Sequence, residues 1–286
     1  MKSYIECYSC FVRQSVDAGK IATSDENIRW EIMKEVMKKS LEFSRDDSPA
    51  IMGKVIHQIV RDISGNNDPY KNVKDEYNKK ASKMIGFLTK IIDESGEKLH
   101  TALKIAAIGN IIDFGPYGMY GPSLEEFVCK KLKSEFAGNV GFGDFKNKLD
   151  NAKSVLYVAD NCGEIVFDSI FINRFLKDKT VYLATRGGAV LNDVTMDDIK
   201  EIQFSDNVKL IDTGDNAPGA ILKFCSDEFN KLYNDVDLVI LKGQGNYEGI
   251  GKPNRKNVYS VLIVKCPVIA SHIGCAKNEL VLTVPD

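Results

Sequence analysis

The chain has 286 residues, 44% hydrophobic and 27% charged, which is typical of soluble globular proteins and long enough for one large domain or a domain plus a smaller one. The net charge of -2 excludes a general attraction to nucleic acid or anionic membranes, and no apolar run approaches the ~20 residues that span a bilayer. Because the start lacks a signal-peptide core and the seven cysteines are an odd, scattered set, we expect a cytoplasmic protein with reduced thiols.

The first half of the chain has the apolar period of amphipathic helices. Five helices are predicted: one from Ile28 to Leu41; one capped by Ser48-Pro49 with a stripe from Met52 to Ile63; one from Asp68-Pro69 through Ile92; one from Leu99 to Ile111, before Gly115-Pro116; and one from a capping box at Ser123-Leu124-Glu125-Glu126 to about Gly138. No strand is predicted before about residue 150.

The second half has short apolar runs typical of strands. They occupy residues 154–159, 180–185, 207–211, 236–241, 258–264 and 279–284. Several are separated by stretches long enough for a crossover helix, which predicts an α/β fold with a mostly parallel sheet. The segment 138–153, rich in Gly, Lys and Asn, is the predicted boundary between a helical subdomain (1–150) and an α/β domain (151–286).

Turns dense in polar residues follow the first four predicted strands. They are Asp160-Asn161-Cys162-Gly163-Glu164, Arg186 to Thr195, Thr213 to Gly219 and Lys242 to Glu248. The carboxyl ends of parallel strands share one edge, where open α/β sheets bind ligands. Loop composition explains one such turn, whereas four turns carrying Asp, Asn, Lys and Glu favour a functional site.

The first of these turns has the composition of a cation and phosphate site. Asp160 and Asn161 follow a predicted buried strand, and the amides of Cys162, Gly163 and Glu164 begin a predicted helix whose N-terminus attracts anions. A carboxylate and an amide oxygen beside such amides suit a hard cation that also holds phosphate. The alternative is that Asp160-Asn161 only caps the helix.

Several common catalytic motifs are absent from the sequence. The first strand is not followed by G-x-G-x-x-G, and no P-loop, G-x-S-x-G elbow or H-E-x-x-H occurs. The histidines His57, His100 and His272 lie away from the four turns, so they are interpreted as helix-face or core residues. Oxygen donors without imidazoles favour Mg²⁺, Mn²⁺ or a similar divalent ion over a zinc-hydrolase centre.

Among the charged residues of the later turns, Lys242 and Asp193 each allow two interpretations. Lys242, just beyond its strand, could reach a phosphate as a point charge or could be a solvated strand-end charge. Asp193 could bend back toward Asp160 or cap a helix near Thr195. Glu248, considered alone, is interpreted as a surface charge of a loop.

Two further motifs come from the helical half. Asn110 and Asp113, three residues apart on the fourth predicted helix, could cover the polar edge or end that helix in solvent. Cys7-x-x-Cys10 supplies two thiols, half of a structural zinc site, and a structural role or partial metal site is favoured over redox catalysis.

The motifs taken together identify a resemblance that covers nearly the whole chain. They are Cys7-x-x-Cys10, Gly109-Asn110-Ile111-Ile112-Asp113-Phe114-Gly115, Asp160-Asn161-x-Gly163-Glu164, Asn192-Asp193-Val194-Thr195 and Lys242-Gly243-Gln244-Gly245-Asn246-Tyr247-Glu248. In this order they resemble the metal-dependent damage-control phosphatases, first catalogued as domain-of-unknown-function family 89. The short form with C-x-x-C is similar to the archaeal and bacterial branch.

The resemblance implies an α/β/α sandwich with a mainly parallel sheet, preceded by an N-terminal helical subdomain. It also implies a divalent metal, Mg²⁺, Mn²⁺, Co²⁺ or Ni²⁺, held by Asp160, Asn161 and Asp193, whereas Lys242 matches the family's phosphate-contacting lysine. The implied partner is a small phosphorylated metabolite, either a sugar phosphate or a damaged phospho-metabolite.

The expected reaction is metal-assisted attack of water on a phosphate monoester. The expected catalytic residues are Asp160, Lys242 and Glu248, with Asp160, Glu164 and Glu248 as rival proton acceptors. The residues expected to bind the phosphate or substrate are Asn110, Asp113, Gly163, Glu164, Arg186 and Lys242.

Two alternative functions remain open from the sequence. An S-adenosylmethionine-dependent carboxyl methyltransferase, proposed for one relative, ranks lower because no glycine-rich loop follows the first strand. A non-catalytic metal or phospho-metabolite binding protein would bind ligand without turnover. No pattern in the sequence specifies the substrate, the metal or the oligomeric state.

Overall fold

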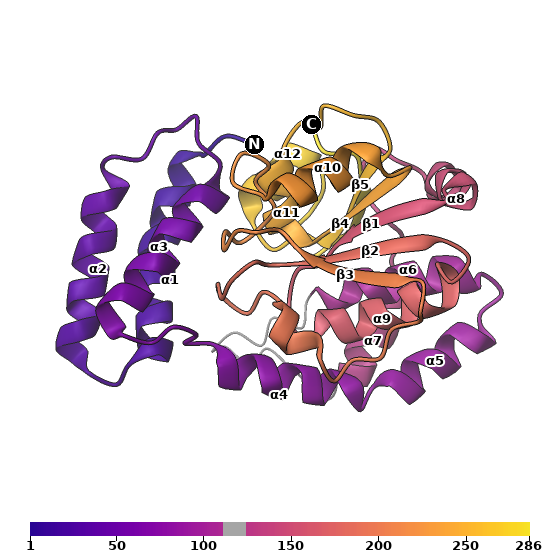
Figure 1. Ribbon diagram of the computed structural model, residues 1–286, viewed down its shortest axis with the longest axis horizontal. Helices are drawn as coiled ribbons and strands as arrows, with labels where there is room; N and C mark the ends of the chain where they lie inside the picture. Colours follow the sequence, from indigo (N-terminus) through magenta and orange to yellow (C-terminus); the bar gives the residue numbers. More distant parts are fainter. Residues whose placement is uncertain (111–123) are drawn as a thin grey trace.

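The computed structural model describes residues 1–110 and 124–286 (Figure 1). The predictions for Asp113, Gly115-Pro116 and the capping box at Ser123 therefore lie outside the described residues. None of the described helices is both long enough and apolar enough to cross a membrane.

The first three helices form a bundle at one side of the molecule (Figure 1). They are α1 (Ile5–Ala22), α2 (Glu26–Ser40) and α3 (Pro49–Ser64). The predicted cap of α3 is confirmed, because the Ser48 hydroxyl accepts from the Ala50 amide at 3.3 Å. Helix α1 was not predicted, since small and polar residues such as Ser15 and Gly19 on its buried face weaken the apolar period.

Five more helices precede the sheet in the chain. They are α4 (Lys71–Ser82), α5 (Ile85–Glu94), α6 (Lys98–Gly109), α7 (Leu124–Leu132) and α8 (Phe142–Asn151). The single helix expected from Asp68 through Ile92 is wrong, because the chain breaks into α4 and α5 at Lys83 and Met84 without a Gly or Pro signal. The fifth predicted helix ends at Leu132 rather than near Gly138.

The predicted strands are all present and form one six-stranded sheet. They are β1 (Ser154–Val158), β2 (Thr180–Thr185), β3 (Val208–Asp212), β4 (Leu238–Lys242), β5 (Val258–Ile263) and β6 (Leu280–Thr283), in the order β3-β2-β1-β4-β5-β6. The first five strands pair in parallel, and β6 is antiparallel to β5. The expected mostly parallel α/β sheet is confirmed.

Helices cover both faces of the sheet (Figure 1). The helices that follow β1 in the chain are α9 (Glu164–Phe175), the short 3-10 helix η1 (Met196–Ile199), α10 (Asp227–Asp235), α11 (Gly243–Ile250) and α12 (Pro267–Ile273). Alternate residues of β1 enter different cores: Tyr157 packs with α6 and α9, whereas Leu156 packs with α10. This arrangement is the expected α/β/α sandwich.

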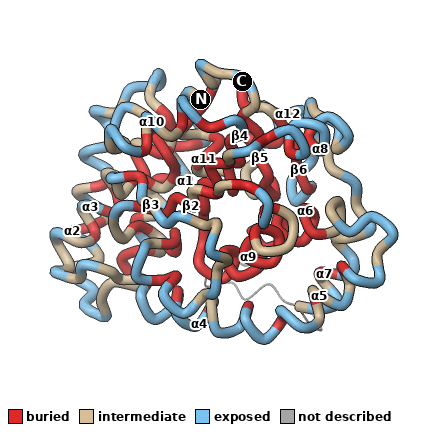
Figure 2. Tube along the Cα trace, turned by 45° about the vertical axis from the view of Figure 1, so that its right-hand side comes forward, coloured by how far each residue is buried: buried red, intermediate tan, exposed pale blue. Residues whose placement is uncertain are grey.

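The hydrophobic core on the α9 face of the sheet contains residues from before and after position 150 in the chain. Leu88 of α5 and Ile105 of α6 belong to the same buried cluster as Phe167 of α9 and Ile240 of β4. Figure 2 shows the central strands and α9 as buried, while the edge strand β3 and the outer helices α2, α4 and α5 expose much of their surface. Helix α6 is buried from Ala102 to Gly109, so its C-terminal end lies inside the molecule.

Candidate active site

Polar side chains meet at the carboxyl edge of the sheet, at the point where strand order reverses between β1 and β4. Asp160 and Asn161 follow β1, Asp193 lies in the loop after β2, and Lys242 ends β4. Asn110 reaches the same place from the end of α6. Each of these five residues is at most 7% exposed, so the structure gathers predicted site residues into a buried cluster.

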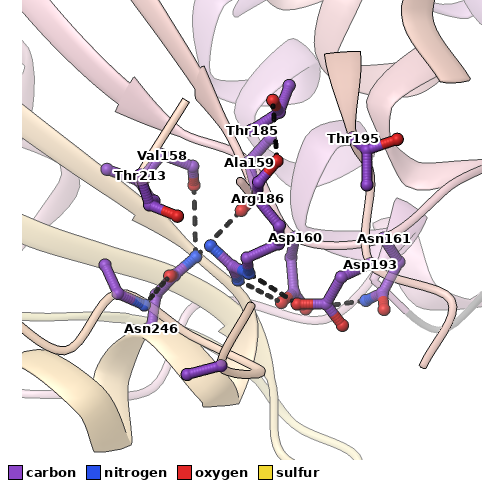
Figure 3. A network of polar contacts seen from close by, with 12 residues as sticks. Val158, Ala159, Asp160, Asn161, Thr185, Arg186, Asp193, Thr195, Thr213 and Asn246 are labelled. Carbon is purple, nitrogen blue, oxygen red and sulfur yellow. Dashed lines mark hydrogen bonds and ion pairs between the residues drawn. The ribbon is translucent and has the colours of Figure 1, made fainter. Parts of the chain in front are cut away.

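Arg186 lies between the two acids of this cluster (Figure 3). Its Nε donates to Asp193 Oδ2 at 2.7 Å, and one Nη donates to Asp160 Oδ1 at 3.3 Å. The Val194 amide donates to the Asp160 carbonyl at 2.8 Å, so the main chain also holds the two loops together. Asp193 therefore lies beside Asp160, and the capping role belongs instead to Thr195, which precedes η1.

Burial raises the pKa of Asp160 well above its usual range. The neighbouring carboxylates of Asp193 and Glu164 raise this pKa further, whereas the charges of Arg186 and Lys265 lower it. Several acidic side chains thus lie near few positively charged side chains, in a site that is largely buried. Such a place favours the binding of an additional cation.

Glu164, the first residue of α9, orients two side-chain amides. Its Oε2 accepts from Asn110 Nδ2 at 2.8 Å and from Asn161 Nδ2 at 3.1 Å. Both amide nitrogens also donate to Asp160 Oδ2, at 2.9 Å and 2.6 Å respectively. The Asn161 nitrogen is thus directed at carboxylates, which leaves its carbonyl oxygen as the end available to a cation.

Lys242 does not have the surroundings of a phosphate-binding residue. Its Nζ donates to Glu164 Oε1 at 2.6 Å, Asp168 Oδ1 at 2.8 Å and the Ala106 carbonyl at 2.9 Å, and the residue is 0% exposed. An ammonium has three N–H donors, and here all three are used within the protein. In this structure Lys242 is a buried counter-ion for two acids, and its direct contact with phosphate stays a prediction.

Three other residues expected to contact phosphate also bond to groups of the protein. The Gly163 amide donates to Asn78 Oδ1 at 2.6 Å, so it does not face an open anion site. Arg186 is 1% exposed and its Nε and one Nη are engaged with carboxylates. Glu164, with both oxygens accepting, likewise orients neighbours and does not face substrate. These residues support the acids, while the second Nη of Arg186 has no hydrogen-bond partner among the described residues. Their contact with phosphate stays a prediction.

Glu248 is not brought to this cluster. It lies on α11, since the segment from Gly243 to Ile250 is helix and not the expected turn. Its carbonyl accepts from the Met1 amine at 3.2 Å and from the Ser48 hydroxyl at 3.0 Å. Burial raises the pKa of Glu248 to about 7, opposed by the Met1 ammonium. Among the described residues, no hydrogen bond or ion pair joins its carboxylate to the acids at the sheet edge.

The remaining predicted residues are placed as follows. Asp113 lies outside the described residues. Cys7 and Cys10 lie three residues apart on α1 as free thiols, and Cys7 is buried. The three histidines lie on α3, α6 and α12 and not at the sheet edge.

Lys265 is a site residue that the sequence analysis missed. It lies two residues past the end of β5, is half-buried, and carries a charge close enough to lower the pKa of Asp160. Because β5 is parallel to β4, its carboxyl end lies on the same edge as Lys242. A lysine just after the fifth strand was the signal that could have identified it.

The donors at this edge fit a hard divalent cation. Two carboxylates and an amide oxygen, from Asp160, Asp193 and Asn161, are ligand types that Mg²⁺ and Mn²⁺ accept. Arg186 already places one positive charge between the two acids. Within residues 1–110 and 124–286, no group of three or more His, Cys, Asp or Glu side chains is arranged to hold a metal.

Comparisons with known proteins agree with this architecture. Residues 3–281 match the family model described as damage-control phosphatase ARMT1-like domain. An uncharacterized protein of Methanocaldococcus jannaschii is 35% identical over 97% of this chain and 93% of its own length. A damage-control phosphatase of Pyrococcus horikoshii is 33% identical over 98% of this chain and 97% of its own length.

A solved structure gives the same result for the fold. The crystal structure of a domain-of-unknown-function 89 family protein from Pyrococcus horikoshii superimposes with a TM-score of 0.87 at 32% identity, and the match covers 100% of both chains. The expected resemblance and the expected class of enzyme, a phosphatase, are thereby confirmed. The chain belongs to the family of damage-control phosphatases with an ARMT1-like domain.

Proposed function

We propose that this chain hydrolyses phosphate monoesters of small metabolites, sugar phosphates or damaged phospho-metabolites, with the help of a divalent cation. The observation that carries the proposal is the pair of buried acids, Asp160 and Asp193, at the switch point of the sheet. Relatives named damage-control phosphatases support it, since they align with nearly the whole chain.

Asp160, Asn161 and Asp193 would hold the cation, which would be Mg²⁺, Mn²⁺, Co²⁺ or Ni²⁺. When bound, such a cation supplies Lewis-acid chemistry that polarises a phosphoryl oxygen and lowers the pKa of water. Arg186 orients both acids by donating to one oxygen of each. Glu164 directs the nitrogen of Asn161 away, so that its carbonyl oxygen is presented.

Lys265 is the proposed contact to the phosphate. It is half-buried just past the carboxyl end of β5, and its charge acts on Asp160. A lysine ammonium binds phosphate as a point charge and neutralises charge that develops on its oxygens. Of the three acids considered as proton acceptors, Asp160 is favoured because it lies at the proposed cation site beside Asp193. Glu164 is instead fully buried in an ion pair with Lys242.

The test is phosphate release from p-nitrophenyl phosphate and a panel of sugar phosphates. Metal-stripped protein receives Mg²⁺, Mn²⁺, Co²⁺ or Ni²⁺, and Asp160→Ala and Asp193→Ala are assayed beside it. We expect release only with metal, and loss of at least 100-fold in both variants, since each removes a ligand. No release with any metal would contradict the proposal, and titration with S-adenosylmethionine would then test methyl transfer.

Lys265→Met separates phosphate contact from metal binding. Loss of a charged hydrogen bond of about 1.5–3 kcal/mol raises KM by roughly 10- to 100-fold, with metal affinity unchanged. Lys277→Met is the control, because Lys277 is an exposed lysine in the turn before β6. Equal KM values for Lys265→Met and the unmodified chain would remove Lys265 from the site.

A further inference from the structure

We infer that Asp168, which was not among the expected site residues, is a positioning residue for the metal ligands and acts on them through Lys242 and Glu164. The inference rests on the proposed function, because it concerns the same cation. Asp168 lies one helical turn after Glu164 on α9, so both acids face the same ammonium. All three side chains are 0% exposed.

The first link runs from Asp168 to Lys242. Asp168 Oδ1 accepts from Lys242 Nζ at 2.8 Å, and the second oxygen of this carboxylate has no hydrogen-bond partner among the described residues. The Lys242 ammonium donates to three acceptors: Asp168 and Glu164 on α9, and the Ala106 carbonyl on α6. Without Asp168 one buried donor would lose its acceptor, and Lys242 would move toward Glu164 to compensate.

The second link runs from Glu164 to the metal ligands. Its Oε1 is fixed by Lys242 at 2.6 Å, which determines where its Oε2 lies. That second oxygen accepts from the side-chain nitrogen of Asn161 at 3.1 Å and from its main-chain amide at 3.4 Å. Movement of Glu164 would therefore release Asn161, whose carbonyl oxygen is one of the three proposed ligands.

The competing explanation is that Asp168 only stabilises the fold as a partner in a buried ion pair. Such pairs are common, and breaking one is destabilising wherever it lies. The chain contains a matched pair for comparison: Asp198 and Lys74 have side chains that are each 1% exposed, and they are joined at 2.8 Å. A purely structural role predicts that neutralising either acid has the same consequences.

The experiment measures Mn²⁺ binding to metal-stripped protein by isothermal titration calorimetry. Asp168→Asn keeps the size of the side chain and removes its charge, and Asp198→Asn is the control. We expect the Mn²⁺ affinity of Asp168→Asn to fall by roughly 10- to 100-fold, as for other residues that orient metal ligands, and that of Asp198→Asn to stay within about twofold. At saturating Mn²⁺, the KM of Asp168→Asn for p-nitrophenyl phosphate should equal that of the unmodified chain.

Each outcome of the Mn²⁺ titrations either supports or overturns the positioning role of Asp168. Unchanged Mn²⁺ affinity in Asp168→Asn, or an equal loss in both variants, overturns the positioning role. If the unmodified chain binds no Mn²⁺, the proposed function fails and takes the inference with it. If Asp168→Asn does not fold, Asp168→Glu takes its place, since it keeps the charge and moves the carboxylate by one methylene group relative to Lys242. A severalfold loss of Mn²⁺ affinity then supports the inference, and an unchanged affinity overturns it.

Discussion

Replacing Lys242 with methionine tests whether this lysine is a counter-ion or a phosphate ligand. Methionine has a similar length, but it leaves Glu164 and Asp168 facing each other without the ammonium that bridges them. It also leaves the Ala106 carbonyl without this donor. Breaking a buried ion pair from one side costs about 3–5 kcal/mol, a large share of the roughly 5–15 kcal/mol that stabilises a typical domain.

The assay is urea unfolding followed by circular dichroism, with the metal removed. We expect Lys242→Met to lose about 3–5 kcal/mol of unfolding free energy, and the double variant Lys242→Met with Asp168→Asn to regain part of it, because one uncompensated charge is gone. The double variant should still bind Mn²⁺ weakly, since Glu164 remains unanchored.

One result would refute this reasoning. If Lys242→Met unfolds with the free energy of the unmodified chain and only its KM for phosphate esters rises, then Lys242 contacts the substrate and is not a counter-ion. Full additivity of the two substitutions in the double-variant cycle would argue the same way, because it would show that Lys242 and Asp168 do not interact.

Two further predictions concern pH and a glycine. Burial lowers the pKa of His57 from 6.5 to about 3, so its contribution to stability is present above pH 6.5 and declines as the pH falls toward 3. Relative to His57→Phe, the unmodified chain should lose about 3 kcal/mol of unfolding free energy between pH 7 and 4.5, and parallel urea-unfolding curves would contradict this. A Cβ on Gly243 would lie 1.8 Å from Asp160 Oδ2, whereas one on Gly274, also at positive φ, would meet nothing within 4 Å. Gly243→Ala should therefore abolish Mn²⁺ binding in calorimetry and Gly274→Ala should not, although both introduce a strained backbone of about 1–2 kcal/mol; equal affinities would contradict the contact.

The sheet was predictable because its signals are local. Each strand is a short apolar run followed by polar residues, and this pattern placed Asp160 and Asn161 correctly at the end of β1. The parallel arrangement then placed the loops after β1, β2 and β4 on one edge, where Asp193 could either bend toward Asp160 or cap a helix near Thr195. These inferences need only the period of side chains along a strand and the sharing of an edge.

The roles of the charged residues were less predictable, because they depend on partners distant in sequence. The Lys242 ammonium donates to Asp168 and to the Ala106 carbonyl, which makes it a buried counter-ion. Neither contact has a signal in the sequence. Lys265 was not predicted because the turn after β5, Val264-Lys265-Cys266-Pro267, lacks the dense polar residues of the first four turns. Glu248 was expected in a loop, but Gly243 and Gly245, which normally favour turns, begin helix α11.

The long sequence separations within the acid cluster also determine when the site can form during synthesis. Asp160 contacts Asn110 across 50 residues, and Lys242 contacts Ala106 across 136. A chain emerging from the ribosome with its N-terminus first completes α6 and α9 long before β4 is made. Until then Glu164 and Asp168 have no ammonium between them, so this helix interface cannot close in its final form. We therefore expect the ability to bind metal to appear late in folding, after β4 has paired with β1.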